Sequence, residues 1–244
     1  MSEQVRWNPW HGCHKVSEGC RNCWMHSIDA KYERDGNIVA ISTSQFGVPI
    51  RLDRYHDYKY PSGTLFTTCF CSDFFISEAD AWRGDAWDII RERSDCMFLI
   101  LTKRPERVMG CLPSDWGITG YQNVILAVSC ENQHWADIRV PIIMQIPCLK
   151  HLMFCAPLLE KIDLSRAIEL EIDEVNVGGE NCKLARPCQY EWVEDMYNQC
   201  LNAGNVKFQF WATGSNFWKD GVRYNIRKLD VQKDQARRSG LIIE

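Results

Sequence analysis

The chain has 244 residues, a length that suits one large domain or two small ones and leaves room for a sizeable buried core. Apolar residues make up 45% and charged residues 25% of the sequence, a balance that excludes disordered, collagen-like and coiled-coil chains. The formal net charge of −4 gives no general attraction to nucleic-acid phosphates or anionic membranes, and no apolar run approaches the roughly 20 residues of a membrane span.

Runs of apolar and β-branched residues predict a series of strands along the chain. They fall at residues 4–8, 64–71, 96–102, 123–130, 150–155, 172–178 and 206–211. Several of these runs are apolar throughout, which favours strands that are covered on both faces. Helical spacing predicts helices from about residue 77 to 90, over 105–108 and over 189–203, where Gly204 suits the end of the last helix.

Strands and helices that alternate about six times predict a parallel α/β domain. We favour a full or partial TIM-like barrel of about six strands, with a doubly wound open sheet as the second choice. We expect residues 1–244 to form a single domain, with a cysteine loop at about 11–24 and a C-terminal basic segment at about 215–244. Either architecture places functional residues just after the carboxyl ends of the strands.

The sequence contains 13 cysteines, an odd number that rules out complete disulfide pairing within the chain. The first residues lack the basic and then apolar layout of a secretory signal, so we expect a reduced, cytoplasmic protein. In that compartment, clustered cysteines indicate a metal site or catalysis more often than disulfides.

Three cysteines, Cys13, Cys20 and Cys23, follow the spacing C-x6-C-x2-C in a glycine-bearing loop that leads into a predicted helix. Three thiolates can hold three irons of a 4Fe–4S cluster and leave the fourth iron open for a substrate or cofactor. S-adenosylmethionine radical chemistry requires such a vacancy, because the amino and carboxylate groups of that cofactor bind the open iron. The common spacing in radical enzymes is C-x3-C-x2-C, so the first interval here is longer than usual.

Two other interpretations of the cysteine loop remain open. A histidine could complete a Cys3His zinc site, since a C-x2-C pair is a common half of such sites. The candidate histidines are His11, His14 and His26. Alternatively, the three cysteines are reduced thiols that bind no metal.

Short sequence segments from residue 7 to residue 241, which include the three cysteines, form a characteristic series along the chain. WNPWHGC at 7–13 is followed by KVS at 15–17 and GCRNC at 19–23, then LTKRPER at 101–107 and VSCENQ at 128–133. PLL at 157–159, VGGE at 177–180, ARP at 185–187 and ARRSGL at 236–241 complete the set. In this order the segments resemble a phage-associated, uncharacterised family labelled phage gene product 37/68 and described as radical-SAM-like. The chain departs from that family at Ala156, where a glutamate is usual, and at Asn181 and Cys182, which replace a Ser-Gly pair.

The resemblance implies a barrel-like α/β fold with a 4Fe–4S cluster on the three cysteines of the loop. The reaction and substrate of that family are open. Our own leading hypothesis is a radical S-adenosylmethionine enzyme that generates a 5′-deoxyadenosyl radical, acts on an unknown substrate and receives electrons from a reductant protein. The alternative is a metal-stapled, phage-related binding protein, with zinc or a structural cluster, that associates with nucleic acid and has no turnover.

Polar residues after the predicted strands are candidates for binding the small-molecule cofactor. By strand order, Ser72 and Asp73 suit the amino group of S-adenosylmethionine. Ser129, Glu131 and Asn132, after a later strand, suit the hydroxyls of its ribose. The same clustering also occurs where strands simply emerge into solvent.

Two further strand ends carry candidate binding residues. Lys103 and Arg104 can bind a carboxylate or phosphate, and their alternative role is a solvated pair at the rim. Gly178 and Gly179 allow close approach of adenine or substrate, or else form a tight turn after the strand. Glu180 would then face the ligand as a cofactor-binding or catalytic carboxylate.

Other residues have weaker functional indications. Cys71, Cys130 and Cys182 lie near strand ends and are candidates for a catalytic hydrogen donor or an auxiliary ligand. Arg186 follows Glu180 closely, and a structural ion pair between the two is the favoured interpretation.

The segment 219–238 holds seven basic and three acidic residues together with aromatic side chains. Such a mixture suits a nucleic-acid surface, but it is more often a solvated face.

Overall fold

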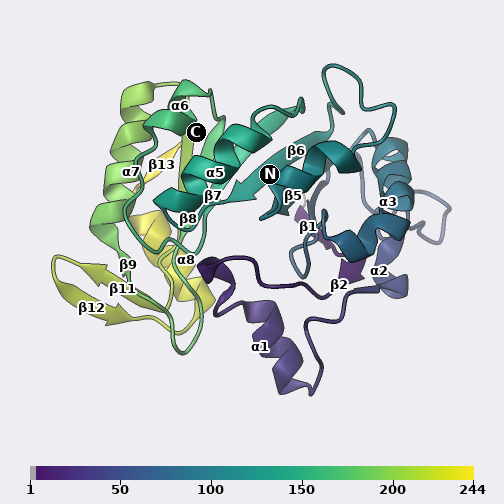
Figure 1. Cartoon of the computed structure of the whole chain (residues 1–244). Helices are drawn as coiled ribbons and strands as arrows, with labels where there is room; N and C mark the ends of the chain where they lie inside the picture. The colour runs from purple at the N-terminus through teal and green to yellow at the C-terminus, as the bar shows by residue number, and fades with distance from the viewer. Residues whose placement is uncertain (1–3) are drawn as a thin grey trace.

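The computed structural model describes residues 4–244, whose strands form one large sheet and two small ones. The large sheet has eight strands, all parallel to their neighbours except the last pair. In spatial order they are β1 (Gln4–Trp7), β4 (Leu65–Thr68), β5 (Met97–Thr102), β6 (Val124–Ser129), β7 (Lys150–Cys155), β8 (Glu174–Gly178), β10 (Lys207–Ala212) and β13 (Ile242–Ile243). The strands follow chain order from one edge to the other, and the sheet curls into half a barrel (Figure 1).

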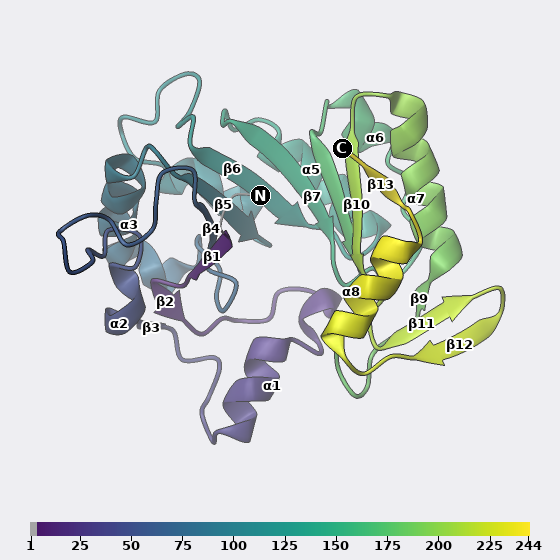
Figure 2. The ribbon, with the colours of Figure 1, turned by 180° about the vertical axis from the view of Figure 1, so that it is seen from behind.

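Helices connect the strands, and the opposite views in Figures 1 and 2 show α5, α6 and α7 on one face of the sheet. The α-helices are α1 (Trp24–Lys31), α2 (Thr43–Phe46), α3 (Asp80–Glu92), α4 (Pro105–Val108), α5 (Gln133–Ile143), α6 (Ser165–Glu169), α7 (Tyr190–Ala203) and α8 (Leu229–Arg238). Short 3-10 turns are η1 (Glu18–Cys20), η2 (Ser77–Ala79) and η3 (Met109–Cys111). The small sheets are β2 (Trp10–His11) with β3 (Ala40–Ile41), and β9 (Cys188–Gln189) with β11 (Asn216–Lys219) and β12 (Val222–Asn225).

The predicted parallel α/β class is confirmed, but the prediction of about six strands is too low. Every predicted strand run overlaps a strand of the large sheet, and β13 adds an antiparallel edge beside β10. The C-terminal basic segment is therefore part of the fold, since α8 and β13 both pack beside β10 at this edge. The open curl makes the sheet a half-barrel, and its likeness to a TIM or radical-SAM barrel stays a prediction.

Local geometry explains where the elements end. The predicted strand 64–71 stops at Thr68, because Cys69 adopts a left-handed φ of 59° that no strand continues through. The helix predicted from residue 77 begins with one 3-10 turn before α3. Gly204 ends α7 in the left-handed conformation, as its position in the sequence predicted.

The two faces of the sheet differ, because alternate strand residues point to opposite sides. Phe98, Leu126 and Val177 belong to the main core under the helices and are fully buried. Leu99, Ala127 and Leu152 form a separate apolar cluster on the opposite, inner face. Around this cluster lie half-buried apolar side chains, namely Leu65, Phe70, Leu101, Ile125 and Phe154. The inner face is therefore apolar and partly open.

Across residues 4–244, none of the helices combines the length and the apolar character that crossing a membrane requires.

Candidate functional site

The cysteine loop, residues 11–24, lies at the carboxyl ends of the parallel strands, between β2 and α1. Its first turn is fixed by backbone hydrogen bonds from Gly12 N to Cys71 O (3.2 Å) and from Cys13 N to Gly36 O (2.9 Å). Gly12 has a φ of 94°, and a Cβ there would lie 2.1 Å from the carbonyl oxygen of Ile38. The turn therefore requires glycine immediately before the first of the three cysteines.

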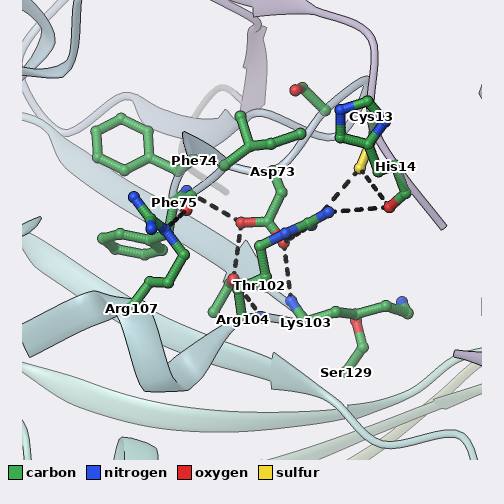
Figure 3. Close-up of polar contacts among 12 residues, drawn as sticks. Cys13, His14, Asp73, Phe74, Phe75, Thr102, Lys103, Arg104, Arg107 and Ser129 are labelled. Carbon is green, nitrogen blue, oxygen red and sulfur yellow. Dashed lines mark hydrogen bonds and ion pairs between the residues drawn. The ribbon is translucent and has the colours of Figure 1, made fainter. Parts of the chain in front are cut away.

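The ends of β4 and β5 hold the start of this loop through a buried ion pair, Asp73–Arg104 (Figure 3). Asp73 Oδ1 accepts a hydrogen bond from Thr102 Oγ1 (2.7 Å), and Asp73 Oδ2 accepts one from Arg104 Nη1 (3.0 Å). The same guanidinium donates to the carbonyl of His14 (2.9 Å) and lies 3.7 Å from the sulfur of Cys13. The pair thus joins two strand ends to the first cysteine.

The end of β6 holds the middle of the loop through a second pair, Glu131–Arg139, whose side chains are each 1% exposed. Glu131 Oε1 accepts from the backbone N–H of Gly19 (3.1 Å), and Glu131 Oε2 accepts from Arg139 Nη1 (3.0 Å). Arg139 also donates to Ser129 O (2.7 Å) and stacks 3.9 Å from the ring of Trp135. A Cβ on Gly19 would lie 2.7 Å from the Glu131 carboxyl carbon, so a larger residue would displace the carboxyl group that Arg139 holds.

The end of β8 holds the last part of the loop through a third pair, Glu180–Arg186 (2.6 Å), which confirms the predicted ion pair. Glu180 accepts a hydrogen bond from Asn22 Nδ2 (2.9 Å), and Arg186 Nη1 donates to the carbonyl of Glu18 (2.9 Å). Burial alone would raise the pKa of Glu180, but hydrogen bonds from Arg186 and Asn22 outweigh it and lower the pKa below 4.5. Glu180 is therefore ionised at neutral pH.

We call Asp73–Arg104, Glu131–Arg139 and Glu180–Arg186 the three clamp pairs, because each contacts the cysteine loop. They come from separate strand ends and reach the beginning, middle and end of the loop. Three buried carboxylates in one region are thus each neutralised by an arginine. The arrangement fixes the path of a loop that has little regular structure of its own.

The three thiols of the loop are free and half-buried. Burial raises the pKa of the Cys13 thiol to about 11, and the charge of Arg104 offsets only part of this effect. Among residues 4–244, no three His, Cys, Asp or Glu side chains are arranged to hold a metal ion. By chemistry alone, three thiols are a donor set that suits a thiolate-bound iron–sulfur cluster.

The histidines proposed for zinc have other partners or surroundings. His11 Nε2 lies 2.6 Å from the buried carboxylate of Asp29, and His14 Nε2 bonds Glu78. Burial lowers the pKa of His26. Neutral imidazole is the form that binds zinc, but none of the three is grouped with the cysteines as a ligand set within the described chain.

The remaining predicted site residues have contacts within the chain. Ser72 Oγ donates to the carbonyl of Gly12, and Asn132 caps α5 by accepting from Trp135 N (3.1 Å). Asn132 also donates to Glu18 in the cysteine loop. The Lys103 backbone N–H donates to Asp73 (3.0 Å), while its ammonium group makes no ion pair in residues 4–244.

Space beside the two glycines at the end of β8, Gly178 and Gly179, is already filled. A Cβ on Gly178 would lie 2.6 Å from the ring of Trp211, and one on Gly179 would lie 2.2 Å from the carbonyl of Thr213. The close approach that these glycines allow is made by the end of β10. In this structure they serve the packing of neighbouring strands, since Gly178 ends β8 and Gly179 contacts the segment after β10.

The strand-end cysteines are protonated at neutral pH. Burial raises the pKa of Cys130 to about 12, and burial also raises the pKa of Cys71 and of Cys182. Protonated thiols are poor nucleophiles and poor metal ligands. A hydrogen-atom donor, by contrast, carries its proton, so the hydrogen-donor interpretation stays open for them.

Sequence reasoning missed Arg139, Gly19 and Asn22. Arg139 lies inside α5, where an arginine is ordinarily a solvent-exposed residue, and nothing in the sequence marks it as buried. Gly19 and Asn22 lie between the cysteines and could have been suspected from that position alone.

Comparison with known proteins finds one family. The sequence model described as "Protein of unknown function (DUF5131)" matches residues 2–239, nearly the whole chain. The same chain matches no curated protein and no solved structure.

Proposed function

Because the chain belongs to the DUF5131 family of proteins of unknown function, we propose a function from its own site: a radical S-adenosylmethionine enzyme of the iron–sulfur class. In this proposal Cys13, Cys20 and Cys23 hold a 4Fe–4S cluster, and the half-barrel is a partial TIM-like barrel of the radical-SAM kind. The observation that carries the proposal is a three-thiol loop held at three strand ends of a parallel half-barrel.

When bound, such a cluster supplies the electron that cleaves S-adenosylmethionine into methionine and a 5′-deoxyadenosyl radical. The residues of the chain would position the loop and control its electrostatics. Arg104 places a positive charge 3.7 Å from the Cys13 sulfur, which offsets part of the effect of burial that raises the pKa of this thiol. Lys103, whose ammonium group is without an ion pair in residues 4–244, is the candidate for a cofactor carboxylate.

The inner face of the sheet would surround the reacting substrate. Its half-buried side chains Leu101, Ile125 and Phe154 are apolar and come from three adjacent strands. An apolar surface excludes water, and exclusion of water protects a reactive radical from side reactions. Cys130, after β6, is fully buried in the main core under the helices, so it faces away from this inner surface.

Anaerobic reconstitution of the full chain with iron and sulfide tests the proposal. We expect a brown protein with about four irons per chain and an electron paramagnetic resonance signal, after reduction, that changes when S-adenosylmethionine is added. Cys13→Ala, Cys20→Ala and Cys23→Ala should each lose the cluster. Cys111→Ala is the matched control, because Cys111 is also half-buried and free but belongs to η3, outside the loop.

Turnover is tested separately by detection of 5′-deoxyadenosine after reduction with dithionite. A colourless protein that carries one zinc per chain, lost in Cys13→Ala, would contradict the enzyme and support the metal-stapled binding protein. A cluster that forms without any spectral response to S-adenosylmethionine would leave only a structural role for the cluster.

A further inference from the structure

A polar pocket of about 310 Å³ lies beside the cysteine loop, on the side of β11 and β12. Its walls come from the segment after β8, from the β11–β12 hairpin and from the residues that lead into α8. The same segment after β8 contacts the cysteine loop, because Asn22 Nδ2 donates to the carbonyl of Leu184 (3.2 Å). The pocket thus shares one wall segment with the candidate site.

The charge of this pocket is opposite to that of the whole chain. Of its nine lining residues, Lys183, Arg223 and Arg227 are cationic, and none is Asp or Glu. The net charge of the full sequence is −4. Three positive charges around one concavity in an acidic protein attract anions to that place.

The donors of the pocket are also available. Within the described chain, Lys183, Arg227 and Asn225 make no side-chain hydrogen bond or ion pair, and Arg223 uses only its Nε, to Asn216 Oδ1 (2.8 Å). Most arginines at this end of the sheet are instead paired with a carboxylate, as in the three clamp pairs. Unpaired guanidinium and ammonium groups beside amide donors are the groups that recognise phosphate.

We propose that this pocket binds the phosphate group of a small phosphorylated ligand about the size of a mononucleotide. The volume lies at the lower end of the range of about 300–1,000 Å³ found for small-molecule sites, so it suits one phosphate with a small attached group. Arg223 and Arg227 provide two-donor forks for phosphate oxygens, and Lys183 adds a point charge. The proposal does not depend on whether the cysteine loop holds a cluster.

Isothermal titration of the purified full chain with inorganic phosphate and with adenosine monophosphate tests the pocket. Two variants change it without touching the fold: Arg227→Gln removes an exposed charge, and Asn225→Asp introduces a carboxylate of nearly the same shape. Each should weaken the binding of both anions by about tenfold or more, the loss expected for one charged hydrogen bond. Lys228→Gln is the matched control, since Lys228 is exposed next to Arg227 but does not line the pocket. It should change affinity by less than about threefold, because it removes only a screened, distant charge.

If Arg227→Gln and Lys228→Gln lost the same amount of anion affinity, the proposed binding site would be overturned. The loss would then come from the change in net charge alone. If neither inorganic phosphate nor adenosine monophosphate bound, the proposed phosphate site would also be overturned. Much tighter binding of a single-stranded oligonucleotide than of the mononucleotide, with steep salt dependence, would contradict the small-ligand proposal. It would indicate that the pocket belongs to a nucleic-acid surface. Circular dichroism of each variant shows whether its fold is intact, and cluster content is measured independently of these titrations.

Discussion

Two groups of basic side chains lie near the carboxyl ends of the strands, and they differ in what neutralises them. Arg104, Arg139 and Arg186 each pair with a carboxylate and contact the cysteine loop directly or through that carboxylate. The cations of the phosphate pocket are exposed and have no acidic partner among its lining residues.

The difference separates structural charge from charge that is available to a ligand. A buried arginine must be paired, because an isolated charge is costly away from water. An exposed arginine has no such requirement and is free to bind an anion. Substitutions in the clamp pairs should therefore reduce stability and loop order, whereas substitutions in the pocket should reduce ligand affinity alone.

Arg139→Met should give the largest loss of stability. It leaves the buried Glu131 carboxylate without its arginine, and removal of one partner of a buried ion pair costs about 3–5 kcal/mol. Urea denaturation followed by tryptophan fluorescence measures the free energy of unfolding. Arg237→Met is the control, since Arg237 is 82% exposed in its pair with Asp234, and its effect should stay within about 0.5 kcal/mol.

A double variant identifies the cause of the Arg139→Met loss. Glu131→Gln removes the orphaned charge but keeps an oxygen that can accept from Gly19 N. Combined with Arg139→Met, it should restore more than half of the lost stability. A double variant as unstable as the single one would instead assign the loss to the packing of Arg139 over Trp135.

Gly19→Ala should have the next largest effect. The added Cβ would meet the Glu131 carboxyl group at 2.7 Å, and overpacking of this kind costs about 1–3 kcal/mol. Because Gly19 precedes Cys20, iron incorporation during reconstitution should fall as well. Gly84→Ala in α3 is the control: nothing lies within 4 Å of its Cβ position, so the helix should gain about 0.5–1 kcal/mol. If the stability and iron content of Gly19→Ala were unchanged, the contact between Gly19 and the Glu131–Arg139 clamp pair would not hold the loop in place.

Glu180→Gln should have a smaller, pH-dependent effect. The folded-state pKa of Glu180 lies below its ordinary value of 4.5, so ionised Glu180 stabilises the fold above that pH. This contribution is lost as the pH falls through the lower folded-state pKa. At about pH 7 the variant should lose about 1–2 kcal/mol, since Arg186 is partly exposed. Urea titrations at descending pH should show the gap between variant and wild type closing below 4.5; a constant gap would mean that the charge of Glu180 contributes nothing.

The strands were predictable because their apolar runs are long and lie between polar turns. The runs at 96–102 and 123–130 correspond closely to β5 and β6. Helix α5 had no specific prediction, since Pro141 lies within it and proline usually marks the end of a helix. The two-residue β13 was also missed, because strand formation there depends on pairing with β10 rather than on local pattern.

The site was predictable in its residues but not in their contacts. Asp73, Glu131 and Glu180 all lie at carboxyl ends of parallel strands, as the strand pattern predicted. Their partners depend on how distant segments meet: Gly19 and Glu131 are far apart in sequence and are joined only by the fold. A carboxylate that ends a strand looks the same in sequence whether it faces a ligand or a loop, so these three side chains were expected to face the cofactor.

Arg227→Gln should have the smallest effect on stability, within about 0.5 kcal/mol, because Arg227 is exposed and has no side-chain partner among residues 4–244. Its predicted loss of phosphate affinity must therefore occur with the fold unchanged. The Glu180 pair offers the opposite case, since its loss should lower stability while phosphate affinity changes little. Thermal unfolding and phosphate titration of both variants, measured side by side, would distinguish the two groups of cations. If Arg227→Gln destabilised the protein as much as Glu180→Gln, Arg227 would belong with the structural arginines, and its charge would not be available to a ligand.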